Sequence, residues 1–195
     1  MPLIPAFEIG VWNAWILMLY LPLHPLIMIL IDKLVGVGNI TKKMGSVPYS
    51  KTEKGIMNSS MVLLVLAFIY SIFLPLKLGE VWFYIGLPIY LFGLIMFVLA
   101  IVSIATTPCG KPFSNGLYRY SRHPMTLFSF FMHLGVGIAT ASWVFILFSV
   151  VCAILWFVLV IPEERGCLEQ YGDAYREYIN RTPRWIGIPK SGESD

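Results

Sequence analysis

Five apolar runs dominate this sequence, and most are long enough to cross a lipid bilayer as a helix. They occupy residues 9–31, 57–78, 81–106, 124–139 and 142–161. A helix that crosses the hydrocarbon layer needs about 20 residues, and it satisfies its own backbone hydrogen bonds there. The runs therefore predict an all-α, polytopic membrane protein with five transmembrane helices.

Composition agrees with this class. Of the 195 residues, 57% are hydrophobic and 13% are charged, whereas soluble domains carry roughly 25% charged residues. The net charge of +3 gives no indication of a nucleic-acid partner. The three cysteines form no CxxC pair, so neither a metal site nor a disulfide framework is expected. The length predicts one domain, residues 1–195.

The first, fourth and fifth runs have distinctive features. The fourth run is short and begins with Pro124, which suits the first turn of a helix. Small residues around Thr140 join it to the fifth run, which predicts a tight helical hairpin and leaves open whether the fourth helix crosses fully. In the first run, Pro22, His24 and Pro25 predict a kinked helix. Such a kink is either a simple bend with a hydrogen-bonded histidine or a gap that admits a lipid.

The basic residues indicate an orientation. Of the 14 Lys and Arg residues, 13 follow the first, third or fifth run, and Lys77 is the exception. Five spans place those three segments on one side, which the positive-inside rule makes cytoplasmic. We therefore expect Lys43 and Lys190 in the cytoplasm, and Met1 and Lys77 outside. The N-terminus is then external, and the C-terminus and any active site built from those three segments are cytoplasmic, in the cell membrane if the source is prokaryotic.

Polar residues gather in two cytoplasmic stretches, 106–126 and 162–189. In the first, His123 precedes Pro124 at a helix N-terminus, where free N–H groups favour an acceptor or an anion. The alternative is a juxtamembrane belt of aromatic and basic side chains.

In the second stretch, Glu163 and Glu164 follow an apolar run directly, where a carboxylate needs a partner. Neighbouring helical residues point about 100° apart, so we expect Glu163 to face a pocket and Glu164 to face water. Beyond the two acids, Leu168, Tyr171, Tyr175 and Tyr178 recur at helical spacing and predict a C-terminal amphipathic helix.

Together these stretches resemble a known family. The motifs are Gly116-Leu117-Tyr118, Arg122-His123-Pro124, Glu163-Glu164, Tyr171-Gly172 with Tyr175 and Tyr178, and Pro183-Arg184. Their order and spacing resemble the isoprenylcysteine carboxyl methyltransferases, and phospholipid N-methyltransferases share much of the pattern. The resemblance covers residues 106–189 and suggests a compact prokaryotic member.

The resemblance implies a membrane methyltransferase that uses S-adenosylmethionine, releases S-adenosylhomocysteine and needs no metal. Residues 1–106 would supply three spans, and residues 107–195 the cofactor-binding catalytic core. The residues expected to contact the cofactor, carried over by position, are Gly110, Lys111, Pro112, Phe113, Tyr118, His123, Pro124, Met125, Thr126 and Glu163. Glu163 and Arg165 are the candidate catalytic residues.

Two positions depart from the family pattern. Thr126 stands where the family usually has tyrosine, and Leu159 stands where eukaryotic prenylcysteine enzymes have a substrate-binding arginine. A clamp for a substrate carboxylate is therefore either missing or supplied by Arg119, Arg165 or Arg184.

The expected partners are membrane lipids and a lipid-like or prenylated acceptor that enters from the bilayer. The expected acceptor is the carboxylate of a C-terminal isoprenylcysteine, with a phospholipid amine as the alternative. Two other classes remain open: an NADPH-dependent reductase similar to the sterol reductases, and a non-catalytic lipid-binding or scaffold protein.

Overall fold

Helices form the framework of this protein. The computed structural model describes residues 7–36, 40, 43 and 47–189. In that part of the chain the helices are α1 (Trp15–Met18), α2 (Tyr20–Val35), α4 (Lys51–Ile72), α5 (Val81–Thr106), the 3₁₀ helix η1 (Gly116–Arg119), α6 (Pro124–Ala139), α7 (Trp143–Tyr171) and α8 (Asp173–Arg181). The predicted all-α class is therefore confirmed for the described residues.

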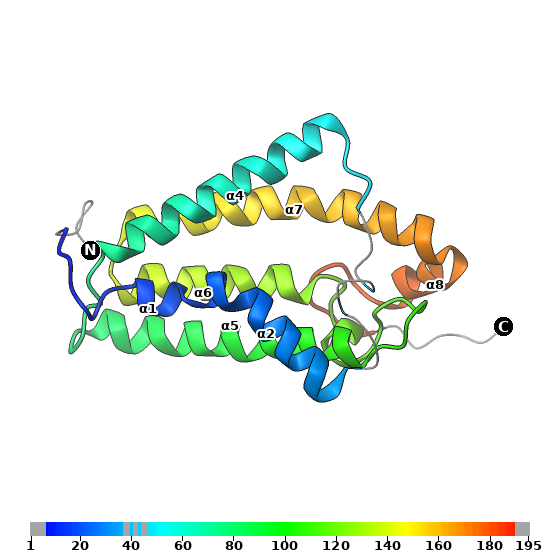
Figure 1. Ribbon diagram of the computed structural model, residues 1–195, viewed down its shortest axis with the longest axis horizontal. Coiled ribbons are helices and arrows are strands. Elements are labelled where there is room, and N and C mark those ends of the chain that lie inside the picture. Colours follow the sequence, from blue (N-terminus) through cyan, green and yellow to red (C-terminus); the bar gives the residue numbers. More distant parts are fainter. Residues whose placement is uncertain (1–6, 37–39, 41–42, 44–46, 190–195) are drawn as a thin grey trace.

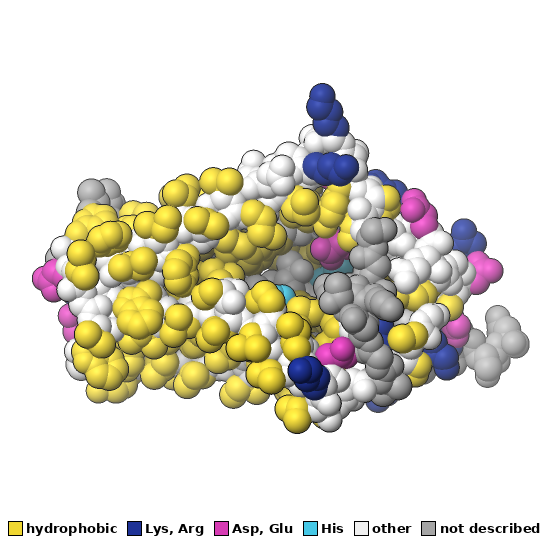
Figure 2. Space-filling view, viewed as in Figure 1, with side chains coloured by type: hydrophobic (Ala, Val, Ile, Leu, Met, Phe, Trp, Pro, Cys, Tyr) yellow, Lys and Arg dark blue, Asp and Glu magenta, His cyan; other side chains and the backbone are white. Residues whose placement is uncertain are grey.

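Four helical segments are long and apolar enough to cross a membrane: Trp15–Val35, α4, α5 and α7. The remaining predicted span, the fourth along the chain, is α6, whose 16 residues make it shorter than these four, so its crossing remains a prediction. On the face shown in Figure 2, hydrophobic side chains cover most of the elongated body, and Lys and Arg side chains gather toward the end that holds α8 (Figures 1 and 2). The apolar helices indicate an integral membrane protein.

Several predicted span boundaries are wrong. The first span is helical from Trp15 to Val35, apart from Leu19, rather than over residues 9–31, and α4 ends at Ile72 rather than at residue 78. Two further boundaries differ for local reasons. Helix α4 begins at Lys51 rather than at residue 57, because Ser50 and Glu53 form a reciprocal capping box. Helix α7 continues past residue 161 to Tyr171, so both adjacent acids lie inside it. Leu168 and Tyr171 therefore belong to α7. The C-terminal helix α8 begins only after Gly172, whose φ of 54° breaks the run.

The first span is divided and bent. It consists of α1 and α2, and Pro25 lies inside α2. Figure 1 shows α2 turning away from α6 and crossing toward the end of α5. The ring of His24 packs 5.6 Å from that of Phe97, and its buried Nε2 has no hydrogen-bond partner among the described residues.

Close backbone contact joins α5 to α6, which lie side by side (Figure 1). A Cβ atom on Gly86 would stand 2.2 Å from the backbone nitrogen of Ala139, and one on Gly135 would stand 2.6 Å from that of Tyr90. Small residues permit this approach, which is typical of helices packed in membranes. Residues 140–142 connect α6 to α7 as a tight hairpin, as predicted. This packing fixes the start of α6 beside the second half of α7.

Candidate active site

A cavity of about 420 Å³ lies near the ends of α6 and α7 that face α8. Its wall includes six of the residues that the sequence assigned to a cofactor site: Phe113, Tyr118, His123, Met125, Thr126 and Glu163. They come from the loop after α5, the start of α6 and the second half of α7. Segments that lie 50 residues apart in sequence therefore converge on one cavity. The roles of these residues in binding stay predictions.

The remaining predicted site residues lie elsewhere in the described structure. Gly110, Lys111, Pro112 and Pro124 are not part of the cavity wall, and Pro112 borders a separate polar groove together with Arg119. Arg165 points toward the start of α4, where its Nη2 donates to Glu53 at 2.8 Å and to the Pro48 carbonyl at 2.6 Å. These residues therefore do not line the cavity together with Glu163 in this structure, and their roles in binding or catalysis stay predictions.

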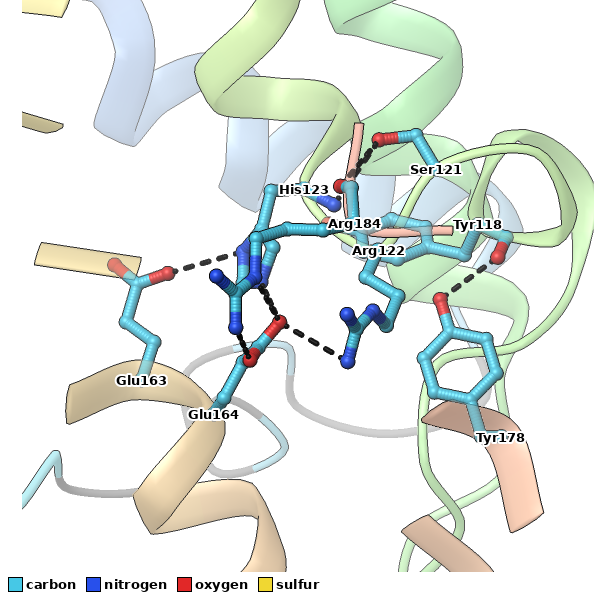
Figure 3. Close-up of polar contacts among 8 residues, drawn as sticks. All are labelled: Tyr118, Ser121, Arg122, His123, Glu163, Glu164, Tyr178 and Arg184. Atoms are coloured by element: carbon cyan, nitrogen blue, oxygen red, sulfur yellow. Dashed lines mark hydrogen bonds and ion pairs between the residues drawn. The ribbon is translucent and has the colours of Figure 1, made fainter. Parts of the chain in front are cut away.

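Glu163 and Glu164 have different surroundings, as the helical geometry predicts. Glu163 lines the cavity, and its Oε2 lies 3.4 Å from Nδ1 of His123. Glu164 does not face water, contrary to expectation. Its carboxylate contacts Arg122 Nη1 at 3.2 Å, His123 Nε2 at 3.2 Å and Arg184 Nη2 at 2.7 Å (Figure 3). The turn of α7 directs Glu164 toward the loop and the C-terminal segment, which supply these three partners.

His123 is held between the two carboxylates. It occupies the N-cap position of α6, and its backbone N–H donates to Ser121 Oγ at 3.2 Å. Burial acts to lower the pKa of His123, but hydrogen bonds and charge attraction from Glu163 and Glu164 outweigh it. The pKa therefore lies above its ordinary value. The sequence flagged His123 from its position before Pro124, but it did not indicate that both acids would contact the ring.

The C-terminal segment closes one side of this cluster. The backbone N–H of Arg122 donates to the Pro183 carbonyl at 3.1 Å, and that of Gly187 donates to the Tyr120 carbonyl at 3.1 Å. Ser121 Oγ donates to the Arg184 carbonyl at 3.3 Å. These bonds fix Arg184 beside Glu164. Sequence reasoning treated Arg184 as a possible substrate clamp and missed this role, because the partner lies 20 residues away.

An aromatic contact and a buried hydroxyl also hold the segments around His123 together. The ring of Trp185 packs 4.2 Å from that of Phe157 and 6.3 Å from that of His123. The hydroxyl of Tyr178 in α8 donates to the Tyr118 carbonyl at 2.7 Å (Figure 3). Burial raises the pKa of Tyr178, so the hydroxyl keeps its proton and remains a donor. The loop, α7, α8 and the C-terminal segment are thereby held together.

Apolar side chains form another part of the cavity wall, which we call the apolar limb. It is lined by Met57 and Met61 of α4, Phe97 of α5, and Trp156 and Leu159 of α7. Figure 2 shows a hollow in this face of the molecule, with an acidic and a histidine side chain at its margin. Tyr49, which precedes α4, also lines the cavity. Sequence reasoning did not identify Tyr49 or Met57, because both lie far along the chain from the motif-bearing stretches.

The cavity fits a nucleoside-sized methyl donor. Its volume falls within the roughly 300–1,000 Å³ typical of small-molecule sites, which combine apolar and aromatic walls with a few polar groups. Aromatic side chains can pack against an adenine ring, and the Glu163 carboxylate can bind ribose hydroxyls or an ammonium group. A search of the described residues finds no group of three or more potential metal ligands.

Comparison with known families agrees with this geometry. A sequence model described as phospholipid methyltransferase matches residues 104–174. The match covers the loop after α5, all of α6 and α7, and the start of α8. A search of curated proteins found no match to the chain. The match over residues 104–174 thus confirms the resemblance to membrane methyltransferases, since the phospholipid methyltransferase family is related to the isoprenylcysteine carboxyl methyltransferases.

Proposed function

We propose that this protein transfers a methyl group from S-adenosylmethionine to a nucleophile carried by a membrane lipid. The observation that carries the proposal is one cavity whose wall combines polar groups with apolar side chains and is built largely from the segment that matches the phospholipid methyltransferases. We call the polar and aromatic groups around His123 and Glu163 the polar limb of the cavity. The apolar limb consists of the apolar side chains of α4, α5 and α7.

The polar limb is the proposed donor site. Its wall would hold the donor by contacts with Phe113, Tyr118 and Glu163, and the donor supplies an electrophilic methyl group on a sulfonium. Methyl transfer depends mainly on alignment of the two reactants and exclusion of water. The contacts of Glu164 and the hydrogen bond from Tyr178 to Tyr118 would help to align the reactants, because they fix the loop that carries Tyr118 and His123.

The apolar limb is the proposed site for the lipid chain of the acceptor. Met57, Met61 and Trp156 lie on helices that are apolar enough to lie within a bilayer. Methionine side chains adapt to apolar ligands of varied shape. A lipid tail in this limb would bring its polar end toward Glu163 and His123.

The charges around the cavity favour an amine as the acceptor. The Glu163 carboxylate lines the cavity and attracts an ammonium group, whereas it repels a carboxylate. The three arginines considered as carboxylate clamps are not part of its described wall. Arg165 binds Glu53, Arg184 binds Glu164, and Arg119 borders the separate groove. A phospholipid amine is therefore the first proposed acceptor.

An isoprenylcysteine carboxylate is the second proposed acceptor. Arg122 lines the cavity, and its buried Nε has no hydrogen-bond partner among the described residues. That N–H could donate to a substrate carboxylate, although the same guanidinium also contacts Glu164 at 3.2 Å.

Calorimetry with S-adenosylhomocysteine tests the donor site. Glu163→Gln removes a charged hydrogen-bond partner worth roughly 1.5–3 kcal/mol, so we expect binding to weaken by about ten- to a hundredfold. The matched control is Glu169→Gln, because Glu169 lies on the exposed side of the same helix and is expected to bind like wild type. Equal binding by all three proteins, or none by wild type, would contradict the donor site.

A panel of acceptors tests the choice of substrate. Purified protein would be incubated with methyl-labelled S-adenosylmethionine and vesicles that contain phosphatidylethanolamine, or with a farnesylated cysteine. We expect label in the phospholipid. Label in the farnesylated cysteine alone would favour the second acceptor, and label in neither would contradict the proposed activity on these lipids.

A further inference from the structure

We propose that Nδ1 of His123 accepts the proton that a lipid-borne amine must lose as it is methylated, with Glu164 holding the imidazole in position. This inference rests on the proposed methyltransferase function and assigns a catalytic role within it. It changes the role of His123 from the cofactor contact that the family resemblance implies to a general base for the acceptor.

The contacts of Glu164 assign the tautomer of the neutral imidazole. Arg184 donates to both oxygens of Glu164, and Arg122 lies 3.2 Å from Oε1, so two guanidinium groups favour the ionised carboxylate. An ionised carboxylate can only accept hydrogen bonds. The contact of 3.2 Å between His123 Nε2 and Glu164 Oε1 therefore requires the hydrogen on Nε2.

The neutral ring consequently presents a lone pair at Nδ1. This atom lies 3.4 Å from Oε2 of Glu163, a carboxylate that lines the cavity. Nδ1 of His123 and Oε2 of Glu163 are both hydrogen-bond acceptors and face each other. A proton that binds to Nδ1 is therefore stabilised by the Glu163 carboxylate. A buried carboxylate that orients a histidine, whose other nitrogen faces the reacting group, is the arrangement that makes imidazole an effective general base.

The groups around His123 favour the protonated ring. Glu163 and Glu164 of α7 contact it directly, Arg122 and Arg184 act on it through Glu164, and Trp185 contributes a neutral ring. Burial and, after it, the nearby Glu163 carboxylate raise the pKa of the Tyr49 hydroxyl, which therefore remains neutral. The pKa of His123 is raised despite burial, which suits a group that must take a proton from an amine near neutral pH.

The proton balance explains why an amine needs this arrangement. In water an amine is mostly an ammonium ion, which has no lone pair for attack. Its N–H proton passes to His123 Nδ1, and the freed lone pair forms the new N–C bond. The methyl donor contributes the methyl carbon, whose bond to sulfur breaks with the electron pair left on sulfur. His123 then passes the proton by way of Glu163, whose side chain is 39% exposed, to water.

A carboxylate acceptor would need no such base. An ionised carboxylate already has a lone pair at neutral pH and loses no proton on methylation. A general base at His123 therefore favours an amine acceptor over a carboxylate acceptor, in addition to the preference that the charge of Glu163 gives.

The pH dependence of kcat on phosphatidylethanolamine vesicles tests the inference. For wild type, we expect kcat to rise with pH through the raised pKa of His123 and then to level off. In His123→Gln, the amide can still donate to Glu164 but cannot accept the proton. We expect kcat to fall by about 10²–10⁴-fold and to lose that pH limb. Glu169→Gln is the matched control, with the wild-type profile expected.

Two further measurements separate this inference from the proposed function. Calorimetry should show that His123→Gln binds S-adenosylhomocysteine as wild type does. If its binding is lost instead, His123 is a cofactor contact and the inference is overturned. Methylation of the phospholipid by His123→Gln with an unchanged pH limb would overturn it too, as would label in the farnesylated cysteine alone. Failure of wild type to bind S-adenosylhomocysteine would instead contradict the proposed function.

Histidine titration provides a readout without turnover. In protein labelled with ¹⁵N-histidine, the resonance of His123, assigned by its loss in His123→Gln, should titrate above the ordinary range. It should titrate at lower pH in Glu164→Gln, because one stabilising carboxylate is gone. An unshifted titration in that variant would contradict the role given to Glu164.

Discussion

Arg184 binds Glu164 through two parallel hydrogen bonds, with Nε 3.1 Å from Oε1 and Nη2 2.7 Å from Oε2. The pair joins the C-terminal segment to α7, and Glu164 also contacts Arg122 and His123 at the start of α6. A single carboxylate therefore connects α7 and the start of α6, which border the cavity, to the C-terminal segment. Its loss should affect stability as well as geometry.

The first prediction concerns this pair. Glu164→Gln should reduce the free energy of unfolding by about 1.5–3 kcal/mol, because a charged hydrogen-bond partner is lost at a buried position. A double-mutant cycle with Arg184→Gln, measured by denaturant unfolding in detergent, should give a coupling energy well above zero. The exposed pair of Asp173 and Arg176 is the control, with about 0–1 kcal/mol expected. Equal coupling in both pairs would contradict the central role of Glu164.

A second prediction concerns the contact between α5 and α6. Gly86→Ala should destabilise the fold by about 1–3 kcal/mol, because the added methyl group would overlap the backbone of α6. Gly55→Ala is the matched helical control. A Cβ at Gly55 meets no atom within 4 Å, so greater helix propensity should leave stability unchanged or raise it by up to about 1 kcal/mol. Thermal unfolding of both variants would reveal the difference. Similar melting temperatures would contradict the close approach.

A third prediction concerns orientation in the membrane. Met1 and Lys190 lie outside the described residues, and Lys43 is buried, with its Nζ 2.6 Å from the Ala105 carbonyl. Exposed positions 54 and 80 are therefore better probes. In a Cys109→Ser background, an impermeant thiol reagent applied to intact cells should label Glu80→Cys and spare Lys54→Cys, because 13 of 14 basic residues follow the odd-numbered predicted spans. The reverse pattern would overturn the orientation.

A fourth prediction follows from the raised pKa of His123. The folded protein favours the protonated ring more than the unfolded chain does. The stabilisation is fully present below about 6.5, the pKa of unfolded histidine, and is lost as pH rises through the folded pKa. Unfolding free energies at a series of pH values should therefore decline above pH 6.5 more steeply for wild type than for His123→Gln. Parallel curves would show that His123 has no raised pKa.

The division of the chain into residues 1–106 and 107–195 stays a prediction, as do the external N-terminus and the full crossing of α6. The order of the helices could be predicted from the sequence, because each helix depends on properties of its own segment. Long apolar runs predicted α5 and α6 at their observed bounds, since hydropathy and a proline at the first turn act within one segment. The start of α4 was missed although its signal is local, because hydropathy alone set the boundary and the Ser-x-x-Glu spacing of Ser50 and Glu53 was not used. The continuation of α7 was missed because polar residues can extend a helix whose apolar part is already helical.

The sequence by itself determined the apolar helices, the hairpin of α6 and α7, and the presence of a histidine and two adjacent acids in one family pattern. All of these depend on residue types and on spacing along a single segment. The tertiary structure decided which groups Glu164 contacts, where Arg165 and Arg184 point, and that Tyr49 and Met57 line the cavity wall. Those outcomes depend on how helices and loops from distant parts of the chain pack together, because an arginine pairs with whichever carboxylate the fold brings near.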